Sequence, residues 1–291
     1  MSGTHLIETL INGLISGSIY ALVGSGLALV YGTTRVLNFA HGELLMLAGY
    51  FILLFAVTLG WPVILAAIAT IVLVMVLGAL LQRVTIAPLM AREDWAFSVI
   101  AVTIGLSIFL QSGAQLIWGE QYQGVPYFFH GVAVIGEVRM PWQRIAILVV
   151  ALGVMGICGL ILYRTKLGRI VRATAQDAEA ALAVGIPAGR VHTIVFAISA
   201  GLAGTAAILL SPLITVNPWM GASYLLKGFA VVILGGLGSF GGAVAAGFLL
   251  GLIETFSVAF VPSEWSNVIA FAFLIAVITA RPEGLFAGRG A

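Results

Sequence analysis

Long apolar stretches separated by short polar segments run along almost the whole chain. A helix needs about 20 apolar residues to cross the roughly 30 Å hydrocarbon core of a membrane. Six stretches come close to or reach this length and a seventh is shorter, so the pattern predicts an all-α, polytopic integral membrane protein. The predicted spans are Leu6–Val30, Leu37–Leu59, Trp61–Leu81, Phe97–Trp118, Ile145–Tyr163, Val191–Leu213 and Asn267–Ala280.

One further apolar stretch, Leu225–Phe260, is too long for a single span. The glycine-rich run Gly235–Gly242 interrupts it, so we expect two short segments with an unwound or tightly turned middle. This brings the expected number of crossings to about nine, with eight as the alternative. The first span is expected to stay uncleaved, because no basic stretch precedes its long apolar run.

Basic residues predict the orientation, because lysine and arginine near span ends mark the cytoplasmic side of a membrane protein. With nine crossings and the N-terminus outside, most of the basic residues fall inside and the C-terminus is inside as well. The expected inner residues are Arg35, Arg83, Arg92, Arg164, Lys166, Arg169, Arg172, Arg190, Arg281 and Arg289. The outer side keeps Arg139, Arg144 and Lys227. The sequence therefore predicts N-out, C-in.

Two connections between the predicted spans are long. Residues 119–144 form an outer loop, and residues 164–190 form an inner loop that is the most charged segment of the chain. The other connections are short, and no repeat of 20–50 residues is visible. We expect residues 1–291 to form a single transmembrane domain.

Composition supports lipid as the solvent. Hydrophobic residues make up 61% of the chain and charged residues only 8%, whereas a soluble domain carries roughly 25% charged residues. The 36 glycines also fit membrane helices, in which glycine lets backbones approach closely. The formal net charge of +2 argues against nucleic acid as a partner, because binding it needs a basic face.

Motifs for nucleotide and metal chemistry are missing from the sequence. Lys166 and Lys227 are the only lysines, and neither follows the glycine pattern of a phosphate-binding loop. The four histidines are scattered, without the spacing of a zinc site. We therefore expect no catalytic residue, no metal and no cofactor on this chain, and no enzymatic activity of its own.

The polar segment Asn38–Glu43 has two interpretations. A charged residue inside a membrane helix is costly, so Glu43 should face protein or water and pair with His41 or an inner-loop arginine. In one interpretation Asn38, His41 and Glu43 line the inner mouth of a translocation pathway. In the other, Asn38 caps a helix and Glu43 sits near the positive end of the helix dipole.

The glycine break also has two interpretations, which are compatible with each other. Non-helical backbone at membrane depth is tolerated where it lines a cavity, and broken helices often line transport pathways. The alternative is tight helix packing through small residues, which the following Gly247-x-x-x-Gly251 favours. The pathway candidates in this run are Gly235, Gly236, Gly238, Ser239, Gly241 and Gly242.

The inner loop contains a predicted short helix of about ten residues. Thr174-x-x-Asp177 resembles a capping box, and the alanine-rich segment that follows is typical of a helix. Gly185 is a natural C-terminal stop, and Pro187 prevents continuation. An ordinary surface helix is the alternative to a functional one.

Several of these stretches resemble one family. Glu179-Ala180-Ala181 followed by Gly185 is similar to the E-A-A-x-x-x-G loop of ABC importer permeases, which docks a coupling helix onto an ATPase subunit. Residues 26–32, 35–43 and 232–242 resemble the branched-chain amino acid ABC permease family, of the shorter first-subunit kind. The likeness runs from Leu10 to Arg281.

The resemblance implies a bacterial inner-membrane importer that moves branched-chain or other small uncharged-side-chain amino acids by alternating access. It implies as partners a longer paralogous permease, two ATP-binding subunits that hold ATP and magnesium, and an extracytoplasmic binding protein. The coupling residues would be Thr174, Asp177, Glu179, Ala180, Ala181 and Gly185. Two alternatives stay open: a urea or short-amide permease of the same family, and an ion-coupled secondary transporter that uses Glu254.

Overall fold

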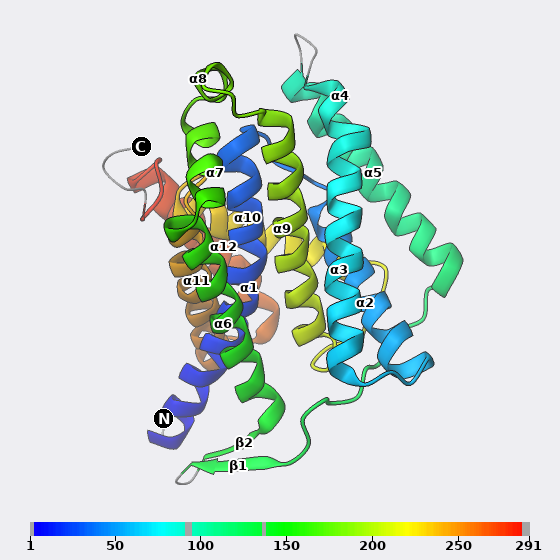
Figure 1. The fold of residues 1–291 in the computed structure, drawn as a ribbon. Helices are drawn as coiled ribbons and strands as arrows, with labels where there is room; N and C mark the ends of the chain where they lie inside the picture. Colours follow the sequence, from blue (N-terminus) through cyan, green and yellow to red (C-terminus); the bar gives the residue numbers. More distant parts are fainter. Residues whose placement is uncertain (1–2, 91–94, 136–137, 287–291) are drawn as a thin grey trace.

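The computed structural model describes residues 3–90, 95–135 and 138–286. Arg92 and Arg289, which entered the prediction of orientation, lie outside these residues. Helices dominate the described part, and they lie side by side in a bundle (Figure 1). The first and last described residues, Gly3 and Phe286, belong to segments at opposite ends of this bundle (Figure 1).

Seven helical stretches of the described chain are long and apolar enough to cross a membrane. All seven predicted regions contain a helix, but only six of them belong to this set. The full-length helices are α1 (Gly3–Thr34), α2 (His41–Ile52) with its π-helical extension (Leu53–Thr58), α3 (Val63–Leu81), α5 (Trp95–Trp118), α6 (Trp142–Arg164), α9 (Ala188–Leu210) and α11 (Phe240–Phe260). A π-helical turn (Gln82–Ile86) joins α3 to the short α4 (Ala87–Leu89).

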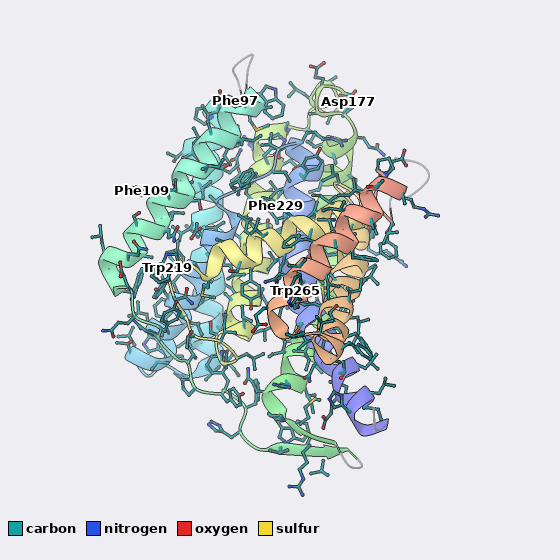
Figure 2. All side chains as sticks on the ribbon, turned by 180° about the vertical axis from the view of Figure 1, so that it is seen from behind. Phe97, Phe109, Asp177, Trp219, Phe229 and Trp265 are labelled. Carbon is teal, nitrogen blue, oxygen red and sulfur yellow. The ribbon has the colours of Figure 1, made fainter. Side chains whose placement is uncertain are left out.

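Two apolar helices are shorter, α10 (Met220–Gly235) and α12 (Ser266–Ala280). Figure 2 shows α10 running obliquely across the bundle from Trp219, with Phe229 along its length. The predicted break is present, since α10 ends at Gly235 and α11 begins at Phe240. The expectation that both flanking segments are short was wrong, because α11 has 21 residues and only α10 is short.

The two long connections lie at opposite ends of the bundle (Figure 1). One holds α7 (Lys166–Gln176) and α8 (Ala178–Ala183), and we call this end the α8 end. The other holds a β-hairpin, β1 (Val132–Ile135) antiparallel to β2 (Val138–Pro141), in which Val132 pairs with Pro141. We call it the hairpin end. The all-helical expectation missed this small sheet, whose strands have only four residues each.

Helix α1 forms the centre of the bundle and packs mainly against α11, α9 and α10. Glycines let α1 and α11 touch through their backbones: a Cβ added at Gly251 would lie 2.3 Å from the Cα of Gly17, and one added at Gly247 2.4 Å from the Cα of Ala21. The predicted packing role of the Gly247-x-x-x-Gly251 motif is thus supported, since any side chain here would force the helices apart.

The outer helices differ sharply from α1. Within the apolar windows, 89% of α1 but only 11% of α5 is buried. The exposed side chains of α5 are large and apolar, as at Phe109 and Leu116, which are 71% and 88% exposed. Figure 2 shows Phe109 pointing away from the bundle. In water such a surface would be strongly unfavourable, so the outer helices require lipid or another membrane protein around them.

Candidate functional site

The predicted coupling helix is in fact two helices that meet at Asp177. Thr174 lies inside α7, where its hydroxyl donates to the carbonyl of Ile170 (3.1 Å). Asp177 itself caps α8, because one carboxylate oxygen accepts from the backbone N–H groups of Glu179 and Ala180 (2.9 Å each). The capping-box prediction for Thr174 was therefore wrong. The cap belongs to the next helix, and Thr174 is buried in the helix before it.

The predicted stop after α8 is present. Gly185 has a φ of +85°, and its N–H donates to the carbonyl of Leu182 while the N–H of Ile186 donates to that of Ala181 (2.9 Å each). This pair of bonds is the Schellman pattern that ends many helices, and it needs a residue with positive φ. Pro187 then occupies the position directly before α9. The segment from Lys166 to Pro187, which we call the elbow, is fixed at both ends of α8.

The elbow presents an apolar tip at the α8 end. Leu182 and Val184 are 62% and 76% exposed, whereas Ala181 is buried against its own chain. Sequence reasoning missed these two residues, and it placed Ala181 on the docking face although Ala181 points inward. Two large apolar side chains side by side in a polar loop are the signal that could have found them.

Contacts with α1 and α6 attach the elbow to the bundle. Arg35, at the end of α1, donates to the carbonyl of Ala175 in α7 (3.1 Å). Arg172 donates to the carbonyl of Leu162 in α6 and lies 5.7 Å from the ring centre of Tyr163. The guanidinium of Arg172, one of the basic residues of the inner loop, therefore contacts its own chain.

The glycine break lies near the α8 end rather than at mid-bundle. A Cβ added at Gly238 would lie 3.1 Å from the Cα of Gly32, near the end of α1, and one added at Gly235 would lie 2.5 Å from the carbonyl carbon of Gly242. Gly236 and Gly238 have φ values of +92° and +86°. Ser239 accepts from the N–H of Gly242 (3.1 Å) and so caps α11. These contacts support a tight turn that packs on α1.

A small cavity of about 120 Å³ lies beside this turn. Gly238 and Ser239 line it together with Tyr163 and Arg172. Gly241 is exposed at the start of α11. The turn and the elbow therefore face a common space, although they are far apart in the sequence.

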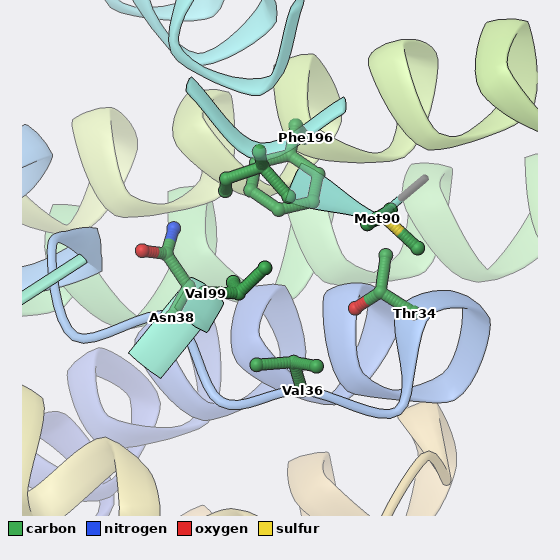
Figure 3. Close-up of a pocket in the computed structure, with 7 residues that line it drawn as sticks. Thr34, Val36, Asn38, Met90, Val99 and Phe196 are labelled. Atoms are coloured by element: carbon green, nitrogen blue, oxygen red, sulfur yellow. The ribbon is translucent and has the colours of Figure 1, made fainter. Parts of the chain in front are cut away.

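Asn38, His41 and Glu43 lie at the start of α2, where all three are buried. The Asn38 side chain accepts from the N–H of Ala40 (3.0 Å), so it shapes the turn before the helix rather than capping it. His41 lies 3.4 Å from the hydroxyl of Ser199. Figure 3 shows Asn38 beside Val99 at one side of a recess, with Thr34 at its opposite side. This recess leaves no room for a water molecule (≈ 0 Å³).

Glu43 is bound differently from what the sequence suggested. Its carboxylate accepts from the hydroxyl of Ser107 in α5 (2.9 Å), and no bond to His41 or to an arginine is found among the described residues. Its second oxygen is buried without a hydrogen-bond partner in the described chain. Glu43 does lie in the first turn of α2, as the helix-dipole interpretation predicts.

The start of α2 also meets the start of α10. A Cβ added at Gly42 would lie 2.4 Å from the carbonyl oxygen of Gly221, so the two backbones touch. Glu43 is close to this crossing, since its second oxygen would lie 3.2 Å from a Cβ on Gly221. The positive ends of two helices therefore lie beside one buried carboxylate, which they stabilise.

Lys227 and Glu254 form an ion pair inside the bundle, with 2.5 Å between the Lys227 Nζ and a Glu254 carboxylate oxygen. Lys227 also donates to the hydroxyl of Tyr20 (2.7 Å). Placing Lys227 on the outer side was therefore wrong, because it lies within α10 and pairs with α11. Each of these two helices carries one charged residue. Two lone opposite charges in neighbouring spans are the signal that could have predicted the pair.

A polar cavity of about 610 Å³ adjoins this ion pair. Tyr20 and Glu254 line it, and it extends along α1 to His5. We call it the vestibule. Among the described residues, no group of three or more His, Cys, Asp or Glu side chains converges to hold a metal ion.

Comparison with known proteins places the chain in a family. Residues 9–278 match the family described as the permease component of branched-chain amino acid transport systems. The chain belongs to this family. Because the family is one of transport permeases, its match confirms the predicted resemblance, the multi-pass membrane character and the expectation of a non-enzymatic subunit. No solved structure matches the chain.

Individual relatives agree with the family match. The high-affinity branched-chain amino acid transport system permease protein BraD of Pseudomonas aeruginosa is 35% identical, over 97% of this chain and 95% of its own length. LivH of Escherichia coli K12, named for the same kind of system, is 31% identical with the same coverage. The autoinducer 2 import permease LsrD of Salmonella paratyphi B is 29% identical over 64% of this chain and 59% of its own length.

Proposed function

We propose that this permease is the shorter of two related membrane subunits in a bacterial ABC importer for branched-chain amino acids. The similarity to BraD and LivH over 97% of the chain carries this proposal, because both are named for high-affinity branched-chain amino acid transport. The similarity to LsrD is weaker and shorter. The partners would be a longer permease, two ATPase subunits and an extracytoplasmic binding protein, with ATP and magnesium held by the ATPases.

Uptake by cells tests the substrate. In a strain that lacks its own branched-chain importer, the chain expressed with its cognate partners should restore uptake of labelled leucine, isoleucine and valine. Urea and short amides serve as the control substrates, because a urea or short-amide permease is the alternative that the sequence leaves open. Uptake of urea or an amide without any uptake of the three amino acids would contradict the proposal.

The proposed orientation is N-out, C-in in the inner membrane, with nine crossings. It treats residues 1–291 as one transmembrane domain, in which α10 and α12 cross in addition to the seven long stretches. The start of α1 and the end of the described chain lie at opposite ends of the bundle, which supports an odd number of crossings (Figure 1). The α8 end would then be cytoplasmic, with residues 164–190 as the coupling loop, and the hairpin end, with residues 119–144, extracytoplasmic.

Thiol labelling tests this orientation. Cys158 is buried and would be replaced by alanine. Single cysteines would then be placed at Tyr122 and Glu283, two exposed positions near opposite ends of the bundle. An impermeant reagent added to intact cells should label Tyr122→Cys and spare Glu283→Cys until the cells are opened. The reverse pattern would contradict the orientation.

The elbow is the proposed contact with the ATPase. Within it, Asp177 caps the start of α8 and Gly185 ends this helix. A hydrogen bond from Arg35 to the carbonyl of Ala175 attaches the elbow to α1. Glu179 and Ala180 are exposed beside the apolar tip of Leu182 and Val184, whereas Thr174 and Ala181 hold the elbow together from inside. A rigid element of this kind can transmit the movement of a partner to the membrane helices.

The start of α2 is the proposed pathway element at the inner side. Its buried carboxylate, Glu43, keeps one oxygen without a hydrogen-bond partner in the described chain, and a buried charge of this kind is costly to retain without a use. The glycines from Gly235 to Gly242 are proposed to shape the inner end of the pathway through their packing on α1.

A further inference from the structure

The vestibule has one polar wall, and α1 provides it. Its α1 residues recur at steps of three or four, which places them on a single helix face. They are His5, Thr9, Asn12, Ser16 and Tyr20. The stripe covers 15 helical steps, or about 22 Å along the helix. A polar stripe of this length on a membrane helix indicates a water-filled space rather than lipid.

The ion pair closes the inner end of this stripe. Tyr20 is the last residue of the stripe, and its hydroxyl accepts from Lys227, whose Nζ lies 4.7 Å from the centre of the Tyr20 ring. Lys227 and Glu254 are 19% and 16% exposed. Glu254 lines the vestibule, and Lys227 contacts two of the lining residues, Tyr20 and Glu254. Three helices, α1, α10 and α11, thus bring one positive group, one negative group and one hydroxyl together.

The cluster has hydrogen-bonding capacity to spare. A lysine ammonium has three N–H donors, and the structure uses two of them, toward Tyr20 and Glu254. One carboxylate oxygen of Glu254 is buried without a hydrogen-bond partner in the described chain. Buried polar atoms normally have partners, so this arrangement leaves a free donor next to a free acceptor.

We propose that the vestibule is the route by which the amino acid enters the permease, and that Lys227 and Glu254 bind its zwitterionic head. The remaining N–H of Lys227 donates to the α-carboxylate, and the free oxygen of Glu254 accepts from the α-ammonium group. This inference rests on the proposed import of amino acids, and it adds the residues that recognise the part common to leucine, isoleucine and valine.

Electrostatics favours this assignment. A zwitterion carries no net charge, and neither does the Lys227–Glu254 pair, so binding brings no uncompensated charge into the bundle. Each charge of the substrate meets the opposite charge of the protein. The cavity of about 610 Å³ also lies within the roughly 300–1,000 Å³ that is typical of small-molecule sites. Urea and simple amides lack both charges, so the same site would hold them poorly.

A purely structural ion pair is the competing explanation, and replacement of both charges separates the two. Lys227→Met or Glu254→Met alone leaves an unpaired buried charge, and we expect less assembled complex. The double variant Lys227→Met, Glu254→Met removes both charges and should assemble at parental levels, since such replacements are often neutral. Glu283→Gln, an exposed charge near the other end of the bundle, is the matched control.

Leucine uptake and ATP hydrolysis are then measured on the double variant with its cognate partners. We expect leucine uptake to fall about tenfold or more, while hydrolysis stimulated by the loaded binding protein stays within about twofold of the parental complex. Leucine uptake near the parental level would overturn the assignment. Uptake by the parental complex is measured before any variant is compared. If the parental complex takes up no branched-chain amino acid, the proposed function is contradicted, and not the assignment of Lys227 and Glu254.

A cysteine in the vestibule gives an answer even if the double variant does not assemble. In a Cys158→Ala background, Ser16→Cys lies in the polar stripe, and Leu10→Cys lies on α1 outside the vestibule lining. A charged, impermeant thiol reagent added outside should reduce leucine uptake about tenfold or more in Ser16→Cys, because the attached group occupies the vestibule. It should leave Leu10→Cys unaffected. Unchanged uptake by fully modified Ser16→Cys would overturn the proposal.

Discussion

The elbow and the vestibule lie at opposite ends of α1 and are built in opposite ways. The elbow is one continuous segment, held by a cap, a glycine turn and a proline, and it presents the apolar residues Leu182 and Val184. The vestibule is assembled from several helices, and the partly exposed ion pair of Lys227 and Glu254 adjoins it. An apolar tip suits a protein partner, whereas paired charges in a cavity suit a small polar solute.

Helix α1 joins the two regions physically. Its 32 residues run without interruption from the polar stripe to Arg35, which follows it directly and holds α7. Near this end, Gly32 contacts the turn between α10 and α11, the two helices that carry Lys227 and Glu254. A movement of the elbow would therefore reach the ion pair through packed backbone, which deforms little.

The largest effect is expected at the apolar tip. Leu182→Asp with Val184→Asp should leave the permease inserted, because both side chains are exposed, but should reduce leucine uptake to background. The reason is that charges replace the apolar surface that would be buried against the ATPase. Co-purification of the ATPase subunits is the measurement, with Glu283→Gln, an exposed position outside the elbow, as the control. Full retention of the ATPase would place the docking contact elsewhere.

A smaller effect is expected at Glu43. Glu43→Gln keeps an acceptor for Ser107 but removes the charge near the helix crossing at Gly42 and Gly221. We expect uptake to fall about tenfold, as expected for loss of an interaction worth about 1.4 kcal/mol, with assembly unchanged. Ser107→Ala tests the hydrogen bond alone. Parental uptake by Glu43→Gln would mean that this carboxylate serves only to start the helix.

The smallest effect is expected at Gly185. A Cβ there would meet no atom within 4 Å, so Gly185→Ala costs only the positive φ of +85°, about 1 kcal/mol. We expect uptake to fall about fivefold at most through a less ordered elbow. Gly189→Ala is the matched control, since that position is equally open but has no positive φ. Equal behaviour of the two variants would show that the turn is not rigid in the working complex.

The same contrast explains what the sequence could and could not predict. The elbow was largely predictable, since Asp177, Gly185 and Pro187 act within a few residues of themselves. The error in this prediction was also local, since it assigned the helix cap to Thr174 instead of Asp177. The vestibule was not predicted, because Tyr20 and Lys227 are 207 positions apart and the pair appears only when three helices pack.

The membrane spans show the same division between local and long-range signals. Their positions in the sequence follow from local hydropathy, and the predicted regions all contain helices. The length of α11 and the location of the glycine break along the bundle could not be predicted from local hydropathy. Both depend on the contact of Gly238 with Gly32 and on the contacts of Gly247 and Gly251 with α1. The exposure of Leu182 and the burial of Ala181 likewise depend on how α8 packs against α7 and α9.

The most direct test measures leucine uptake and ATP hydrolysis together, in proteoliposomes that contain the complete complex with its binding protein. The tip variant Leu182→Asp, Val184→Asp should lose both activities, because the ATPase no longer engages. The vestibule variant Lys227→Met, Glu254→Met should keep stimulated hydrolysis and lose uptake. Loss of both activities in the same proportion in the two variants would contradict the separation of an ATPase-binding end from a substrate-binding end.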